Sequence, residues 1–340
     1  MPTSIELVEQ AMQNEEPPRT PVIPLVGLYS SLCSGYPVSD LLRDGNLQAK
    51  SQLAALQCFK YDGVFTCMDL TVEAEALGAS ITFPQADFPY VSNYPAETPS
   101  AIFDLEMSSI KGTRLLTFVN AIEQLVNRVG QSHLVSTYII GPFTLAGHLI
   151  GVESLLEHAI EDPELTKKIV SYCREVLEPL VEAYISAGTH NVVILEPTAS
   201  SSIISPKFFE KYSAPDLSRM VSRIHKGGVK ATIHICGNTL PILHAMCDTK
   251  ADALSIDSAV DLKEAKEIAK GRATLIGNVD TTLILTASKE NVQKAAEDCL
   301  KKAAQEGGFI LSTGCDMPLE TPNHNVHALV NAATSNMTQH

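Results

Sequence analysis

Positive charge is scarce in this sequence. Its 340 residues include 25 Lys and Arg residues against 39 Asp and Glu residues, which gives a formal net charge of −14. Proteins that bind nucleic acid or anionic membrane surfaces need a positive surface to attract phosphate groups. The charge balance therefore argues against nucleic acid and membrane surfaces as partners.

Long apolar runs are also missing. The sequence has no apolar stretch of about 18 residues, the length that a membrane-spanning helix needs. The opening residues MPTSIELVEQ lack the basic and apolar regions of a secretory signal. We therefore expect a cytoplasmic protein.

Closely spaced cysteines, the mark of a small domain held by disulfides, are absent too. The eight cysteines are scattered over the whole chain, at positions 33, 58, 67, 173, 236, 247, 299 and 315. In a reducing compartment such cysteines are expected to be thiols or metal ligands.

What the sequence does contain is an alternation of short apolar runs with longer amphipathic ones, which is typical of a parallel sheet connected by helices. Eight runs are candidate strands: 22–27, 63–69, 136–142, 192–197, 230–236, 253–257, 274–280 and 308–315. With no linker or change of composition, they predict a single α/β domain over residues 1–340, a (β/α)8 TIM barrel. The alternative is an open doubly wound sheet, but no G-x-G-x-x-G follows the first strand to support it.

One connection is unusually long. Residues 79–113 contain four closely spaced prolines, at positions 84, 89, 95 and 99, which predict an inserted hairpin or lid after the second strand. Residues 1–14 predict a short helix that plugs or flanks the barrel.

Three soft ligands lie at strand ends. His234 and Cys236 are two apart at the end of one run, so their side chains point to the same face, and Cys315 ends another run. One nitrogen and two sulfur ligands suit Zn²⁺, and three protein ligands leave a fourth position open, as in catalytic zinc sites. The alternative is that the cysteines are buried core residues, which is a common fate of free cysteine.

Other polar residues share the strand-end position, where barrel enzymes carry their chemistry. From this position, we expect Asp69, Glu196 and Asp257 to orient the substrate or supply a proton. The alternative for each is a role in capping the next helix.

A second group of residues is expected to serve the cofactor. We expect His148, Asn238 and Asn278 to contact it, although His148 could equally be a core residue at a helix start. Asn238 and Asp316 lie beside the ligands in the sequence and are candidates for supporting them through hydrogen bonds.

Five segments together resemble a known family. Residues 140–147 (IGPFTLAG), 196–200 (EPTAS), 234–239 (HICGNT), 275–280 (LIGNVD) and 312–318 (STGCDMP) are similar to the corrinoid-linked methyltransferases of the uroporphyrinogen decarboxylase superfamily. The resemblance covers nearly the whole chain. The decarboxylases of that superfamily lack the His-x-Cys and distant Cys set and carry an arginine-rich N-terminal motif, whereas residues 24–35 here contain no arginine.

The resemblance implies a barrel whose zinc is held by His234, Cys236 and Cys315 and faces a corrinoid on a separate partner protein. The Asp-x-His-x-x-Gly motif that would bind a corrinoid in this chain is absent. A small methyl donor or a thiol acceptor would complete the reaction. The oligomeric state is left open, with a homo-oligomer as one option.

Two branches of the family remain open. Residues 234–239 look like the branch that methylates coenzyme M from a methylcobamide, whereas residues 68–78 and 312–318 look like members that demethylate a small donor. We favour the second branch, in which a methoxylated aromatic is O-demethylated and its methyl group passes to Co(I) of the corrinoid protein. A metal-free decarboxylase, indifferent to chelators, is the remaining alternative.

Overall fold

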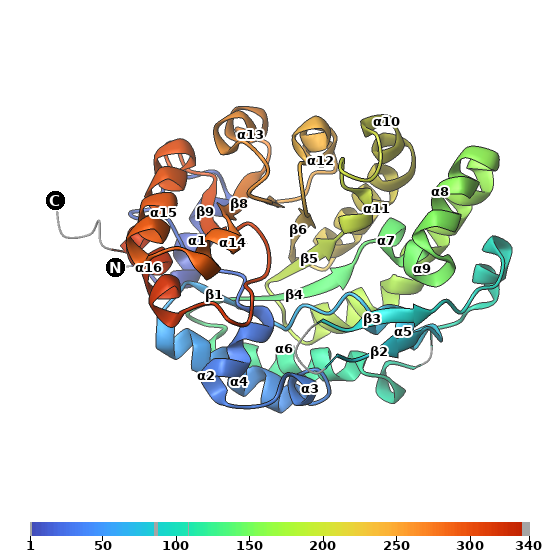
Figure 1. The fold of residues 1–340 in the computed structure, drawn as a ribbon, viewed down its shortest axis with the longest axis horizontal. Coiled ribbons are helices and arrows are strands. Elements are labelled where there is room, and N and C mark those ends of the chain that lie inside the picture. The colour runs from blue at the N-terminus through green and yellow to red at the C-terminus, as the bar shows by residue number, and fades with distance from the viewer. Residues whose placement is uncertain (1, 85–87, 108, 335–340) are drawn as a thin grey trace.

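The computed structural model describes residues 2–84, 88–107 and 109–334. A seven-stranded parallel sheet forms its centre, with neighbouring strands in the order β1-β4-β5-β6-β7-β8-β9. These strands are β1 Gly63–Phe65, β4 Leu134–Ile140, β5 Asn191–Leu195, β6 Lys230–Ile235, β7 Ala253–Ile256, β8 Thr274–Val279 and β9 Phe309–Thr313. The sheet is curled and the helices lie around its outer side (Figure 1).

The connections between the strands are mainly helical, as the alternating sequence pattern predicts. The longer helices are α4 Gly45–Phe59, α6 Leu115–Val129, α7 Pro142–Ile150, α8 Val152–Glu161, α9 Pro163–Ser186, α11 Ala214–Lys226, α13 Leu262–Ala269, α15 Lys289–Ala303 and α16 Asn323–Thr334. The short ones are α2 Ser30–Ser34, α3 Val38–Leu41, α5 Val72–Ala76, α10 Pro206–Phe208, α12 Leu243–Asp248 and α14 Thr281–Thr286. Single turns η4 Pro197–Ala199 and η6 Leu240–Ile242 and a π-helical turn, η5 Phe209–Ser213, complete the connections. None of the described helices has the length and apolar character needed to cross a membrane.

The first expected strand, 22–27, is reduced to a single bridge. Val22 pairs with Leu311 of β9, and its carbonyl accepts a hydrogen bond from the backbone N–H of Asp62, just before β1. The segment then turns into a 3-10 helix, η1 Gly27–Tyr29, in which Gly27 has a φ of +42°. The parallel α/β sheet is therefore confirmed together with seven of the eight strands, and the closed eight-stranded barrel and its single-domain organisation stay predictions.

The expected insertion contains a hairpin. Strands β2 Ser80–Thr82 and β3 Tyr90–Asn93 pair antiparallel, and the turns η2 Pro99–Asp104 and η3 Ile110–Gly112 follow. Residues 85–87 and 108 of the expected insertion lie outside the described residues. The hairpin is anchored by Phe83, directly after β2, whose ring centroid lies 4.2 Å from the Arg43 guanidinium carbon and 4.8 Å from that of Arg114.

The N-terminal helix α1, Ser4–Met12, covers one end of the sheet's concave side. Its start is fixed by a capping box, in which Thr3 and Glu6 satisfy each other's backbone N–H groups. Val8, Ala11 and Met12 are buried in one cluster with residues of the strands, among them Leu134 and Ile310. Apolar residues on alternate positions thus fill the interior, and the intervening ones pack against the outer helices. The short helix expected within residues 1–14 is thus confirmed.

Candidate metal centre

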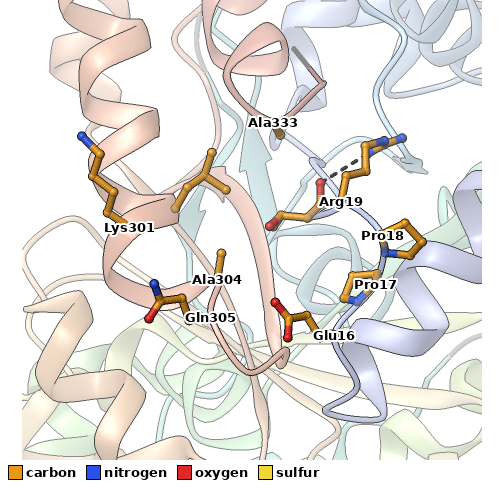
Figure 2. Close-up of a pocket in the computed structure, with 10 residues that line it drawn as sticks. Glu16, Pro17, Pro18, Arg19, Lys301, Ala304, Gln305 and Ala333 are labelled. Carbon is orange, nitrogen blue, oxygen red and sulfur yellow. Dashed lines mark hydrogen bonds between the residues drawn. The ribbon is translucent and has the colours of Figure 1, made fainter. Parts of the chain in front are cut away.

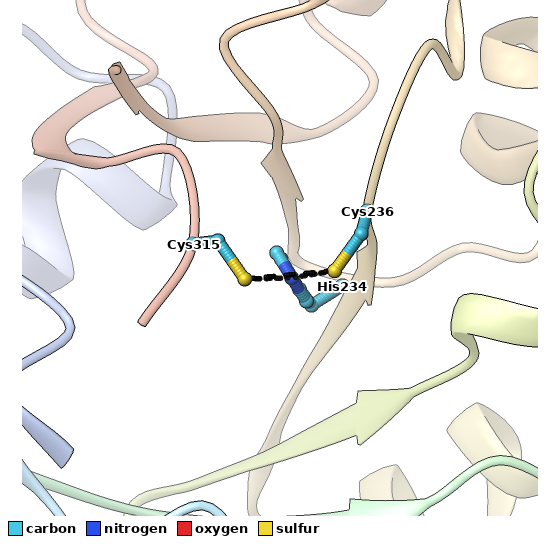
Figure 3. A group of neighbouring side chains, drawn as sticks. All are labelled: His234, Cys236 and Cys315. Carbon is cyan, nitrogen blue, oxygen red and sulfur yellow. Dashed lines mark hydrogen bonds between the residues drawn. The ribbon is translucent and has the colours of Figure 1, made fainter. Parts of the chain in front are cut away.

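His234, Cys236 and Cys315 come together at the carboxyl edge of the sheet. The His234 Nε2 atom lies 3.2 Å from Cys236 Sγ and 3.8 Å from Cys315 Sγ, and the two sulfur atoms are 3.6 Å apart. Figure 3 shows the imidazole between the two thiols, with β6 and the segment after β9 approaching from opposite sides. All three ligand atoms lie within 4.8 Å of one another. The spacing in the sequence therefore predicted a real cluster.

The strand β6 fixes the orientation of His234. The residue is 2% exposed and lies in register between Leu195 of β5 and Ser255 of β7. Its Nδ1 atom is 2.9 Å from Ser255 Oγ. When Nδ1 is engaged in this way, Nε2 is the nitrogen that faces the sulfur atoms and can bind a metal.

The segment after β9 carries the third ligand. Its backbone is held on both sides of Cys315, by a hydrogen bond from Gly314 N–H to the Val279 carbonyl and another from Met317 N–H to the Leu25 carbonyl. The carboxylate of Asp316 packs against Gly27, where an added Cβ would lie 2.2 Å from Asp316 Oδ1. Glycine is thus required at position 27 for this segment to approach.

The three groups perturb one another's titration. The hydrogen bond from Cys315 lowers the pKa of Cys236, whereas that same bond and then burial raise the pKa of Cys315 well above its usual range. Burial lowers the pKa of His234, but the hydrogen bond and charge of Cys315 outweigh it, and the net shift is upward. The hydrogen bond between the two thiols therefore favours the thiolate on Cys236 and keeps the proton on Cys315.

Among the other predicted site residues, Asp257 is brought directly to the cluster. Its Oδ2 atom accepts a hydrogen bond of 3.0 Å from the backbone N–H of Gly237, next to the ligand Cys236, and its Oδ1 accepts one from Ala259 N–H. Asn238 is exposed and uses its Oδ1 to accept from the backbone N–H of Leu240. Asp257 thus supports the ligand turn, while Asn238 caps the turn that follows.

The remaining predicted residues are engaged with neighbouring helices and loops. Asp69 pairs with Arg114 at 2.6 Å, and Asn278 donates to the backbone carbonyls of Asp257 and Val260. His148 is partly buried on α7, and burial lowers its pKa. The catalytic role expected of Asp69 and the cofactor contacts expected of His148, Asn238 and Asn278 stay predictions.

Glu196 is fully buried at the end of β5. Its Oε1 accepts a hydrogen bond of 3.1 Å from Thr144 N–H in the first turn of α7, and burial raises the pKa of Glu196 to about 8. Gly141 makes room for it, since a Cβ there would lie 1.3 Å from Glu196 Oε2. The side chain is packed against the start of α7, and its expected catalytic role also stays a prediction.

Sequence reasoning missed two serines. Ser255 holds the imidazole of His234, and Ser200 Oγ donates a 2.7 Å hydrogen bond to the Cys236 carbonyl. Ser255 could have been found from strand register, because it stands opposite His234 in β7. Ser200 lies in a loop, and no periodic pattern places it.

A cavity of about 250 Å³ includes Asp316, the residue after Cys315, in its lining, but none of the three ligands lines it. The other lining residues are Leu28, Phe88, Met317, Pro318, Leu319 and Glu320. The cavity is mostly apolar, and burial raises the pKa of the Asp316 carboxyl well above its usual range.

A second cavity, of about 330 Å³, lies away from the ligands (Figure 2). Its lining includes Pro17 and Pro18, which precede the bridge at Val22, and Ala304 and Gln305, which precede β9. It therefore lies at the amino ends of the strands, opposite the edge that carries the cluster.

The sheet and the ligand cluster define a class: parallel α/β proteins that present one nitrogen and two sulfur ligands at the carboxyl edge. The chain belongs to the uroporphyrinogen decarboxylase (URO-D) family, whose model matches residues 3–335.

Individual relatives place it more closely. The chain is 28% identical to methylcobamide:CoM methyltransferase MtbA of Methanosarcina mazei over 292 aligned residues, and this alignment covers 85% of this chain and 84% of that protein. It is also 28% identical over 291 residues to methylcobamide:CoM methyltransferase MtaA of Methanosarcina barkeri, with 84% and 83% covered. A solved structure described as a methyltransferase from Methanosarcina mazei matches with a TM-score of 0.90 and 26% identity over 99% of both chains. The chain is thus an enzyme of this family, related to its methyltransferases, and the family resemblance is confirmed.

Proposed function

We propose that His234, Cys236 and Cys315 bind Zn²⁺ and that the enzyme transfers a methyl group between a small substrate and the cobalt of a corrinoid on a partner protein. The observation that carries the proposal is the convergence of one imidazole nitrogen and two thiol sulfurs within 4.8 Å. This donor set fits zinc, and it leaves a fourth tetrahedral position for a substrate atom. When bound, zinc supplies Lewis acidity that keeps a substrate thiol ionised near neutral pH, although the pKa of a free thiol is about 8.5.

The chain's own residues supply orientation. Ser255 keeps Nε2 of His234 directed at the site, and burial of the imidazole excludes water from that side. Asp257 adds a negative charge beside the ligand turn. Methyl transfer to or from cobalt needs the two reacting atoms in line, so a fixed ligand frame lowers the entropic part of the barrier.

For the substrate, the relatives and the sequence motifs favour different classes. The related proteins are named as methylcobamide:CoM methyltransferases, which supports a thiol acceptor, coenzyme M, and a methylcobamide donor. The resemblance of residues 68–78 and 312–318 to family members that demethylate a small donor supports the other class. We therefore retain O-demethylation of a methoxylated aromatic, with transfer to Co(I), as the preferred reaction and methylation of coenzyme M as the second.

The absorbance of cobalamin tests both reactions. Zinc-analysed protein would be offered coenzyme M with methylcobalamin and, separately, a methoxylated aromatic with Co(I) cobalamin. Growth of methyl-cobalt from the aromatic is the expected result. Loss of methylcobalamin only in the presence of coenzyme M would establish the thiol reaction in its place.

A decarboxylase control completes the test. If the protein decarboxylated uroporphyrinogen at an undiminished rate after treatment with a chelator, and transferred no methyl group, the proposed zinc chemistry would be wrong.

A further inference from the structure

The peptide bond that follows the ligand Cys236 is held at both of its polar atoms. Its carbonyl oxygen, on Cys236, accepts a 2.7 Å hydrogen bond from Ser200 Oγ, and its N–H, on Gly237, donates a 3.0 Å hydrogen bond to Asp257 Oδ2. Ser200 comes from the loop after β5, and Asp257 follows β7. The loops that follow the two strands neighbouring β6 thus hold one peptide by hydrogen bonds.

The geometry of Gly237 shows that the chain turns sharply at this peptide. Its φ of +77° lies in the left-handed region that residues with a side chain rarely adopt. A Cβ at this position would also lie 2.8 Å from Ser202 Oγ and 3.0 Å from Ser200 Oγ. The chain therefore turns sharply just after Cys236, and the orientation of the peptide decides where the Cys236 sulfur points.

The loop that carries Ser200 is itself held by hydrogen bonds to α7. Glu196 begins it and is bound to the first turn of α7, and Thr198 N–H donates to Thr144 Oγ1 of the same helix. Ser200 is 3% exposed, so its hydroxyl has little access to water as an alternative partner. Breaking its hydrogen bond would leave the half-buried Cys236 carbonyl without this partner.

We propose that Ser200 and Asp257 are positioning residues for the metal centre, acting together through the Cys236–Gly237 peptide. They hold Cys236 Sγ in place before the metal binds, so that the ligand pair of β6 is preorganised. Asp257 is thereby assigned to the support of a ligand, in addition to the substrate contact that its strand-end position suggests. The inference rests on the proposed zinc site but not on which substrate is methylated.

The test is the zinc affinity of variants, measured by competition with a chromophoric chelator and independently of methyl transfer. Ser200→Ala and Asp257→Ala should each weaken zinc binding by about tenfold to a hundredfold, the usual effect of losing a hydrogen bond that orients a ligand. The visible spectrum of the cobalt(II)-substituted protein, which reports coordination geometry, should change in both variants. Asp257→Asn retains an oxygen that can accept from Gly237 N–H, and it should keep most of the affinity.

The double variant Ser200→Ala/Asp257→Ala distinguishes a joint action from two separate ones. Because both residues act on one peptide, the loss of binding free energy in the double variant should be smaller than the sum of the two single losses. Additive losses would contradict the joint action.

Two control variants remove a hydroxyl and a carboxylate that lie nearby but do not bind the Cys236–Gly237 peptide. Ser202→Ala takes a hydroxyl from the same loop, and Asp261→Asn takes a carboxylate from the N-cap of α13; both leave the two hydrogen bonds to the peptide in place. Zinc affinities equal to wild type in Ser200→Ala and Asp257→Ala, with wild-type protein binding zinc tightly, would overturn the inference. Failure of the wild-type protein to bind zinc would instead overturn the proposed function.

Discussion

At the scale of the residue, burial and hydrogen bonding act differently on individual cysteines. Cys67 and Cys173 are buried among apolar side chains, and burial raises their pKa values far above the usual range of a thiol. Cys236 has a lowered pKa because of its hydrogen bond with Cys315, whose own pKa is raised. A thiol binds a metal as the thiolate, so zinc binding at the proposed site requires Cys315 to lose its proton.

Replacing one ligand should remove the metal while leaving the fold intact. We expect Cys236→Ala to lose stoichiometric zinc and methyl transfer, because two remaining ligands bind zinc weakly. Metal analysis together with circular dichroism would check this, with Cys58→Ala, an exposed cysteine on α4, as the matched control. Full zinc content in Cys236→Ala would contradict the assignment of the ligands.

The buried carboxyl of Glu196 should make stability depend on pH. Its pKa rises from 4.5 to about 8 on folding, so its favourable contribution is complete below the unfolded value and is lost as the pH rises through about 8. Glu196→Gln, which mimics the protonated acid, should therefore gain stability relative to wild type as the pH rises from 4.5 to about 8. Each pKa unit corresponds to about 1.4 kcal/mol, so urea unfolding at several pH values would resolve the effect. A difference between variant and wild type that does not change with pH would show that Glu196 is not protonated in the folded state.

Residue patterns predicted the ligands but not their supports. His234 and Cys236 share a face because side chains in a strand alternate, and that rule needs no tertiary information. The contact between Ser200 and the Cys236 carbonyl depends on how two loops lie after the sheet has formed. No local rule contains that information, which is why the supporting residue was missed while the ligand was found.

At the scale of the element, the hairpin is joined to the sheet through Arg114. This residue precedes α6, has an 11% exposed side chain, and pairs with both Asp69, whose side chain is fully buried, and Glu75 on α5. Its guanidinium group also lies over Phe83, directly after β2 of the hairpin. One side chain thus connects the segment after β1, helix α5 and the inserted hairpin.

Removing the Arg114 side chain should lower the free energy of unfolding. Arg114→Met leaves Asp69 buried without its cation, a change that typically destabilises a protein by about 3–5 kcal/mol. Urea unfolding would measure the loss, and Lys167→Met, which breaks the exposed pair with Glu164, should cause no resolvable change. Equal effects of the two substitutions would show that the Arg114 network contributes no more than a surface pair.

At the scale of the whole molecule, the order of strands and helices was the most predictable property. Seven expected strands are present, since apolar runs separated by amphipathic helices leave few arrangements other than a parallel sheet. The segment 22–27 was predicted as a full strand because it is equally apolar. Its extended part ends at Gly27, where the backbone turns and leaves space for the Asp316 side chain. The two residues are 289 positions apart in the sequence, so no local pattern can reveal their contact.

Zinc should be needed for activity but not for folding. The apolar clusters that hold the sheet and helices together are built without the three ligands, unlike small zinc domains that unfold when the metal is removed. We expect a chelator to abolish methyl transfer with little change in the far-ultraviolet circular dichroism spectrum, and added Zn²⁺ to restore activity. Cooperative unfolding on chelation would show that the metal is structural.

The wide separation of the ligands along the chain has a consequence for how the enzyme matures. His234 and Cys236 leave the ribosome 79 residues or more before Cys315, which follows the last strand of the sheet. Domains acquire their structure as synthesis proceeds, and a two-ligand site retains zinc weakly. At the proposed zinc site, metal loading should therefore be a late event in biogenesis, and we expect a nascent chain stalled before residue 315 not to retain zinc.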